Sequence, residues 1–133
     1  MTYYEKGLLA SFTDANNNSS TFEYDTLGRL TKDTDANGGF TALKRISIPY
    51  GYEVRDSTAE GTVKIFRVQN LPDGTKRKEV QGCCGGSTVT NDKRDGTIET
   101  IFADSTVVKT SLGPDPRFGM LVPVVKSQIV RTP

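Results

Sequence analysis

Few residues in this chain could perform chemistry, and their spacing favours none of the common catalytic centres. The 133 residues contain no histidine, which excludes Ser-His-Asp and Cys-His catalysis as well as histidine-ligated zinc. The two cysteines are adjacent, so one copy of the chain can build neither a zinc knuckle nor a CxxC redox pair. We therefore predict no catalytic residue, no metal site and no cofactor.

Cys83 and Cys84 lie in a glycine-rich segment, Gly82–Gly86, which predicts a loop. Adjacent cysteines can close a strained vicinal disulfide, which would stiffen the loop locally or make it redox-labile, because so small a ring removes almost no chain entropy. The alternatives are two reduced thiols and, with less weight, a disulfide between molecules. In each case we expect the two cysteines to be dispensable for folding.

Asp33–Gly38 matches the opening of an EF-hand calcium loop, with acidic or amide oxygens at alternate positions and glycine sixth. The twelfth position should be glutamate and is Lys44, and no helices are predicted on either side. A tight turn explains the same residues, so the interpretation is a turn and not a metal site.

The composition suits a turn-dense β structure. Only 35% of residues are apolar, 8% are aromatic and there is no tryptophan, while seventeen basic and sixteen acidic residues leave a formal charge of +1. Nothing in this balance favours nucleic acid or an anionic membrane as a partner. No segment approaches the length of a membrane span.

An internal repeat occupies the first forty residues. Gly7-Leu8-Leu9 followed by Thr13–Asn16 recurs 21 residues later as Gly28-Arg29-Leu30 followed by Thr34–Asn37. Periods near twenty are typical of stacked supersecondary units. A unit this short has no room for two helices, so we expect a strand, a turn and a returning strand.

The second copy of the repeat has the clearest hairpin chemistry. Phe22 and Tyr24 alternate with polar residues, which places them on one face of a strand and predicts that Tyr24 faces the packed side. Asp25–Gly28 is typical of a tight turn in which Asp25 accepts hydrogen bonds from its own downstream backbone. Leu30 opens the returning strand, and Asp35–Gly38 closes it with a second turn.

The string from Phe22 to Thr31, followed by Asp35-Ala36-Asn37-Gly38, resembles the YD repeat of Rhs proteins, toxin-complex subunits and teneurins. Later stretches that resemble bacterial YD-repeat proteins are Gly51–Val54, Leu71–Gly74 and Gly113–Met120. The residues that match the motif, and that we predict to be its structural determinants, are Tyr24, Asp25, Gly28, Arg29, Leu30, Asp35 and Gly38. The resemblance implies YD-type hairpins over residues 1–44 and degenerate hairpins over residues 45–133, as one continuous segment of a longer chain.

In the remainder of the chain the period blurs, but turn signals continue. Strands are expected at Thr62–Val68, with a bulge at Ile65-Phe66, and in the segments Thr75–Gln81, Thr97–Phe102, Val107–Lys109 and Met120–Val130. Phe40–Ile48 allows a short helix, and we favour a strand. The predicted fold class is all-β, with antiparallel β-hairpin repeats that form part of a spiralling sheet or shell.

Gly113–Gly119 invites comparison with a self-cleavage site, since Rhs proteins can carry an aspartyl autoprotease whose motifs contain Asp-Pro followed by Gly. Here Arg117-Phe118 separates Pro116 from Gly119, and partner aspartates are not identifiable. A rigid loop between strands explains the two prolines better. The chain is predicted not to be an enzyme.

The resemblance implies a secreted or cell-surface bacterial protein whose repeats form a wall around toxin cargo or an extracellular scaffold. The alternative is a β module that binds carbohydrate or a cell surface through exposed tyrosine and asparagine. Expected partners are neighbouring repeats or identical chains, bound through strand edges. Met120–Val130 is the edge most prone to self-association, although Pro123, Lys126 and Arg131 would oppose it.

Overall fold

A computed structural model describes residues 1–83 and 85–133. In this part of the chain every regular element is a β-strand and none is a helix, which confirms the predicted all-β class. The strands are β1 (Thr2–Tyr3), β2 (Leu9–Thr13), β3 (Ser19–Tyr24), β4 (Leu30–Thr34), β5 (Phe40–Ile48), β6 (Gly51–Thr58), β7 (Val63–Asn70), β8 (Lys76–Gln81), β9 (Ser87–Asp92), β10 (Thr97–Ile101), β11 (Val107–Asp115) and β12 (Gly119–Arg131).

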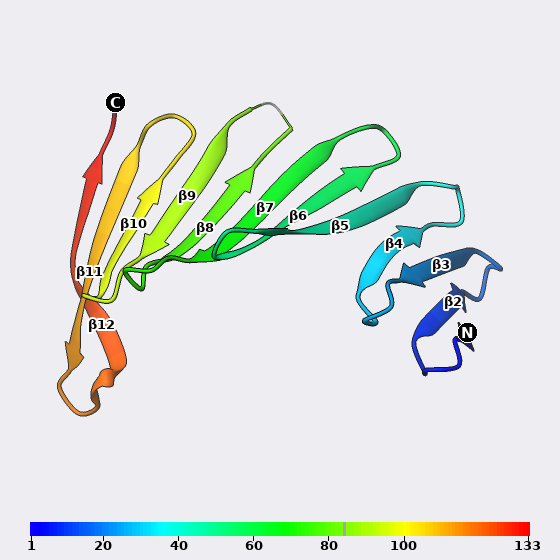
Figure 1. Cartoon of the computed structure of the whole chain (residues 1–133), viewed down its shortest axis with the longest axis horizontal. Coiled ribbons are helices and arrows are strands. Elements are labelled where there is room, and N and C mark those ends of the chain that lie inside the picture. Colours follow the sequence, from blue (N-terminus) through cyan, green and yellow to red (C-terminus); the bar gives the residue numbers. More distant parts are fainter. Residues whose placement is uncertain (84) are drawn as a thin grey trace. The chain divides into compact units, whose positions relative to one another are not determined.

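The strands follow one another through the sheet in the order of the sequence, from β1 to β12. Each inner strand is therefore hydrogen-bonded to the strands that come just before and just after it in the chain. The pairings are antiparallel, as in β7 with β8 and β8 with β9. Figure 1 shows β8, β9, β10 and β11 side by side. This is the hairpin array that the turn signals predicted.

One turn geometry recurs along the chain and explains why short polar segments reverse it. In the turn that begins at Asp25, the Asp25 N–H donates to the Arg29 carbonyl at 2.9 Å, and the Gly28 N–H donates to the Asp25 carbonyl at 3.0 Å. The fourth residue of such a turn has positive φ, which glycine adopts without steric cost. The same pair of bonds occurs in the turns that begin at Tyr4, Asp14, Asp35, Thr58, Leu71, Lys93 and Phe102.

Two of these turns hold a residue other than glycine at the positive-φ position. Asn17 has φ of 66° and Ser105 has φ of 69°. Asparagine tolerates the left-handed region well, whereas serine does so less readily. The serine in the Phe102–Ser105 turn therefore adopts this conformation at some steric cost that glycine would avoid.

The chain divides into two compact units. One comprises Met1–Arg45 and Val54–Lys64, and the other comprises Ile46–Glu53 and Ile65–Pro133. We call them the N-terminal unit and the C-terminal unit. Because β5 and β6 each contribute to both units, neither unit is an independent stretch of sequence.

Neither unit has a conventional core. Among the described residues no apolar side chain is buried, and the buried polar residues are Glu53 and Thr75. A single sheet layer leaves both of its faces open, so apolar side chains become at most half-buried between neighbouring strands. The thin apolar composition is consistent with this arrangement.

The structure also corrects some expected strands. Phe40–Ile48 is a strand, as favoured, but β7 pairs with β8 from Ile65 to Asn70 without a register shift, so no bulge interrupts this pairing at Ile65-Phe66. The segment Ser87–Asp92 forms β9, for which the sequence provided no prediction. Polar and small residues dominate β9, so its apolar alternation is too weak to indicate a strand.

The β11–β12 hairpin is longer than predicted and projects beyond the turns of its neighbours (Figure 1). Its register shifts between Ser111 and Leu112 and again between Gly113 and Asp115. Pro123 lies within the second irregular stretch, where a missing N–H removes no regular ladder bond. No helix capable of crossing a membrane occurs in residues 1–83 and 85–133.

Candidate functional site

Asp25 organises the turn at the centre of the YD-type motif. Its Oδ1 accepts hydrogen bonds from the N–H of Leu27 at 2.9 Å and from the N–H of Arg29 at 3.0 Å. Its Oδ2 accepts from Arg29 Nε at 2.7 Å and forms an ion pair with Arg29 Nη2 at 2.7 Å. Asp25 therefore bonds the turn backbone, as expected, and also holds the arginine that follows Gly28.

The same carboxylate arrangement recurs in the neighbouring turns of the N-terminal unit. Asp14 Oδ1 accepts from Asn16 N–H at 2.9 Å and Asn18 N–H at 2.8 Å. Asp35 Oδ1 accepts from the N–H groups two and four residues later, at 2.8 and 2.9 Å. In each case the aspartate is the first residue of the turn. The side chain thus satisfies backbone donors that would otherwise need water.

The C-terminal unit uses aspartate differently. Asp73, Asp95 and Asp104 are each the third residue of a turn, and each accepts from the N–H two residues later, at 2.8 to 2.9 Å. The described turns therefore include two types of aspartate turn, one in each unit. The interval between equivalent turns is 21 residues from Tyr4 to Asp25 and 22 residues from Leu71 to Lys93.

Several of these turns lower the pKa of their carboxyl group. Five aspartates have a pKa below the ordinary value of 3.8: Asp14, Asp25, Asp73, Asp95 and Asp104. In Asp25 the backbone N–H of Arg29 lowers the pKa most, and in Asp73, Asp95 and Asp104 the backbone N–H of the threonine two residues later does so. In Asp14 the side-chain bond to Asn18 lowers the pKa most. Each bond favours the ionised form, because the carboxylate is the stronger acceptor. We call these five residues the low-pKa aspartates.

The other motif residues occupy the turn and the start of the next strand. Gly28 and Gly38 are the positive-φ residues of their turns, with φ of 76° and 84°. Leu30 is the first residue of β4 and lies opposite Tyr24, next to a register shift. Tyr24 is half-buried, and its ring meets the ring of Tyr4 edge to face at 6.1 Å between centroids. The Tyr24 side chain thus packs against the preceding turn and not in a core.

Tyr4 occupies the position of the missing aspartate in the first turn. Its hydroxyl donates to the Phe22 carbonyl of β3 at 3.1 Å, so the side chain ties the first turn to the next hairpin. Met1 and Tyr3 are also joined, by a bond from the Tyr3 hydroxyl to the methionine sulfur. The turn that begins at Tyr4 is therefore held by a tyrosine side chain, where the turns that begin at Asp14, Asp25 and Asp35 use a carboxylate.

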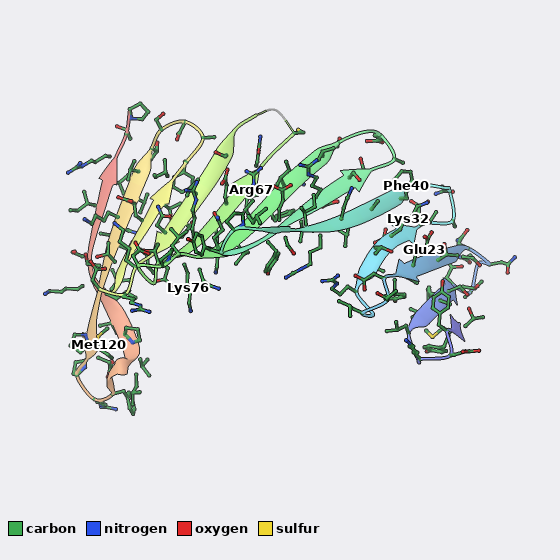
Figure 2. All side chains as sticks on the ribbon, viewed as in Figure 1. Glu23, Lys32, Phe40, Arg67, Lys76 and Met120 are labelled. Carbon is green, nitrogen blue, oxygen red and sulfur yellow. The ribbon has the colours of Figure 1, made fainter. Side chains whose placement is uncertain are left out.

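A charged cluster that the sequence analysis missed joins three strands of the C-terminal unit. Arg67 Nε of β7 donates to Glu53 Oε2 of β6 at 2.7 Å, and Arg67 Nη1 donates to Glu79 Oε1 of β8 at 3.0 Å. Arg77 Nη2 lies 3.4 Å from Glu79 Oε2. Hydrogen bonding to Glu53 is the main reason why the pKa of Arg67 lies above its ordinary value. Figure 2 labels Arg67 within this unit.

The sequence carried no direct signal for this cluster. Glu53, Arg67 and Glu79 are far apart along the chain, and they meet because the register places Arg67 opposite Glu79. A one-residue shift would move Arg67 to the other face. The charged residues themselves are visible in the sequence, but their partners are not.

The other candidates from the sequence are the metal loop, the Gly113–Gly119 segment and the cysteine pair. Within residues 1–83 and 85–133 no group of three acidic or sulfur side chains is placed to hold a metal ion. Asp115 Oδ1 accepts from the N–H groups of Arg117 and Phe118 at 2.7 and 3.0 Å, which is turn chemistry. Cys83 is exposed in its loop, and Cys84 lies outside the described residues, so the vicinal disulfide stays a prediction.

The outermost strand, β12, exposes most of its apolar side chains. Leu121 is 90% exposed and Val125 62%, and β12 pairs with β11 on one side. In Figure 2, Met120 lies on the projecting hairpin. An exposed strand edge of this kind presents unpaired backbone groups to any extended partner.

The segment with the first-position aspartate turns coincides with a family match. The sequence model of the RHS Repeat family matches residues 3–39, which contain the turns at Asp14, Asp25 and Asp35. No curated protein matches the chain. The match at residues 3–39, together with the hairpins that continue beyond it, supports a repeat protein of the YD/Rhs type.

Proposed function

We propose that the chain is a non-catalytic structural segment, one part of a β-sheet wall or extracellular scaffold. The observation that supports this role best is the single-layer sheet, in which no apolar side chain of the described residues is buried. A sheet of this kind gains stability from each further hairpin that pairs with it, as expected of a repeat architecture. The proposal extends over residues 1–44 and 45–133 as one continuous repeat segment.

The wall or scaffold would be completed through strand edges, by neighbouring repeats or by identical chains. β12 supports this proposal, because it is long, exposed and rich in apolar residues. Pro123, Lys126 and Arg131 are the features that oppose pairing. Two versions of the role differ in how assembly ends: a wall around toxin cargo closes at a fixed size, whereas head-to-tail pairing grows into fibres.

The test is sedimentation velocity of the intact chain over a range of concentrations. We expect the sedimentation coefficient to rise with concentration, and a double variant Leu121→Lys, Val124→Lys to remain monomeric. The matched control is Val63→Lys, Val80→Lys, which adds the same charge at exposed sites of inner strands. Monomeric parent protein at every concentration would contradict edge pairing, and equal loss of association in the control would show that charge alone disperses the chain.

A second role, recognition of carbohydrate or of a cell surface, is favoured by exposed aromatic side chains. Tyr3 is 60% exposed and Tyr50 61% exposed, and such rings can stack on sugars. Binding to a panel of immobilised glycans, measured for the parent and for Tyr3→Ala and Tyr50→Ala, tests this role. The proposed role requires at least one glycan that binds the parent but not one of these variants, and that variant must have the same melting temperature as the parent.

We also propose a secreted or cell-surface location, as the RHS-repeat family suggests. Detection of the protein in the culture medium or on intact cells by antibody, with a cytoplasmic marker as control, would test it. Retention of the chain inside the cells together with the marker would contradict the proposed location.

A further inference from the structure

Three turns within residues 3–39 begin with an aspartate and share one backbone geometry, but they differ at the third and fourth residues. Asparagine is a thermolabile residue, because the backbone nitrogen of the next residue can attack its side-chain amide. A following glycine hinders this attack least, since it has no Cβ. The third and fourth residues are Asn16 and Asn17 in the Asp14 turn, Leu27 and Gly28 in the Asp25 turn, and Asn37 and Gly38 in the Asp35 turn. Of these three turns, the Asp35 turn alone places an asparagine before a glycine.

The side chain of Asn37 is exposed and unrestrained. Its backbone N–H donates to Asp35 Oδ1 at 2.8 Å, but within the described residues its side-chain amide makes no hydrogen bond. In the Asp14 turn, by contrast, the side-chain amide of Asn18 donates to Asp14 Oδ2 at 3.0 Å. The Asn37 amide is therefore free to rotate toward the nitrogen of Gly38, whereas the Asn18 amide is held in place.

Two turns of the C-terminal unit have the same spacing, with aspartate in place of asparagine. Asp73 precedes Gly74 and Asp95 precedes Gly96, at the third and fourth positions of their turns. The Oδ1 atoms accept from the N–H groups two residues later, and these bonds hold the pKa of each carboxyl below 3.8. Both groups are therefore ionised at neutral pH. A carboxylate is a poor electrophile, because its negative charge repels a nucleophile, so these turns should not react.

We propose that Asn37 is a site of spontaneous deamidation and that its isoaspartate product loosens the β4–β5 hairpin. The nitrogen of Gly38 attacks Cγ of Asn37, the C–N bond of the side-chain amide breaks, and ammonia leaves with the Gly38 proton. Water then opens the succinimide ring at either carbonyl, which gives aspartate or isoaspartate. The Gly38 N–H donates to the Asp35 carbonyl at 3.1 Å, and this bond must open first, so the folded turn reacts more slowly than a free peptide. The modification does not depend on the structural role proposed above.

The loosening follows from the length of the turn. Isoaspartate at position 37 inserts its Cβ into the main chain, whereas the turn is closed by the Asp35 N–H bond to the Gly39 carbonyl at 2.8 Å and is followed by the pairing of Thr34 with Phe40. A longer turn cannot keep both this bond and this register. The ammonium group of Lys32 on β4 lies 4.7 Å from the Phe40 ring centroid on β5, and Figure 2 labels both side chains. This contact should weaken in the isoaspartate form.

Mass spectrometry of the intact chain, incubated for several weeks at neutral pH in heavy-oxygen water and then digested, tests the reaction. Electron-transfer fragmentation separates aspartate from isoaspartate. We expect the peptide that contains Asn37 to take up heavy oxygen first, as a mixture of the two products, while peptides that contain Asn18, Asn70 or Asn91 are unchanged. An unchanged Asn37 at the end of the incubation, or earlier reaction at another asparagine, would overturn the proposal.

Variants test whether the asparagine–glycine pair is the cause. Leu27→Asn places the same pair in the Asp25 turn, at a side chain that is 74% exposed, and should make that turn react at a similar rate. The matched control is Thr26→Asn, which places asparagine before Leu27 instead of before Gly28 and should not react. Asn37→Leu should abolish the reaction in the Asp35 turn. Equal reaction of Thr26→Asn and Leu27→Asn would overturn the proposal.

Urea denaturation of the separated products tests the effect on the hairpin. The isoaspartate form, isolated by ion-exchange chromatography, should have a lower urea midpoint than the parent. The control is Asn37→Asp, which has the same added charge without the longer main chain and should unfold like the parent. Equal midpoints for the isoaspartate form and Asn37→Asp would overturn the proposed loosening, even if Asn37 reacts.

Discussion

Replacing Arg67 by methionine should destabilise the C-terminal unit more than any other single charge removal. The substitution keeps an unbranched aliphatic stem but removes both the 2.7 Å bond to Glu53 and the 3.0 Å bond to Glu79. The side chains of these glutamates are 7% and 15% exposed, so two carboxylates would remain close together on one face of the sheet.

The expected cost follows from the burial of the cluster. Hydrogen bonds to charged groups contribute about 1.5–3 kcal/mol each, and breaking a fully buried ion pair costs about 3–5 kcal/mol. Arg67 is 27% exposed, and water can reach an open sheet face, which reduces the loss. We therefore expect Arg67→Met to lower the free energy of unfolding by about 2–3 kcal/mol.

Urea denaturation followed by circular dichroism and by tyrosine fluorescence measures this change, provided that the two signals coincide. The matched control is Arg77→Met, because Arg77 is 40% exposed and has one 3.4 Å contact with Glu79. It should cost less than about 1 kcal/mol. If Arg67→Met unfolds like the parent, or Arg77→Met costs as much, the cluster does not hold the strands as described.

Three further changes test the turns, the close contacts and the cysteines. The low-pKa aspartates contribute stability that is fully present above the ordinary pKa of 3.8 and is lost as pH falls through their lowered pKa values. The urea midpoint should therefore drop only below about pH 4, and the drop should be smaller in Asp25→Asn than in the parent. A urea midpoint that does not change with pH would contradict this. Gly51→Ala would push a Cβ into a backbone carbonyl of β7 and should lower the free energy of unfolding by about 1–3 kcal/mol in the same denaturation assay. The control is Gly82→Ala, which should be nearly neutral because its Cβ would meet nothing closer than 3.9 Å. Replacing Cys83 and Cys84 together by serine should leave the melting temperature nearly unchanged, and a large drop would show that the loop carries stability.

The local chemistry of the turns made much of the fold predictable. An aspartate or glycine at a fixed turn position acts through bonds to its own neighbours, as at Asp25 and Gly28, so sequence alone identifies the reversal. Antiparallel hairpins between successive turns then follow with little ambiguity. The strand at Phe40–Ile48 was predictable for the same reason, because turns bound it on both sides.

Features that depend on register were not predictable. The Arg67 cluster requires a particular alignment of β6, β7 and β8, and the Tyr4–Tyr24 contact requires two repeats to stack. The repeat offset aligned Tyr3 with Tyr24, whereas the contact is made by Tyr4, one residue later. In a sheet one residue changes the face, so this difference decides which side chain meets the Tyr24 ring.

Amide hydrogen exchange on β12 tests most directly the claim that this sheet is a piece built to pair at its edge. Exchange is followed by NMR at low and at high protein concentration, with β8 and β9 as internal references because both of their edges are already paired. The account predicts that outward-pointing amides of β12 become protected as concentration rises, while protection in β8 and β9 does not change. Rapid exchange along the free edge of β12 at every concentration would contradict it.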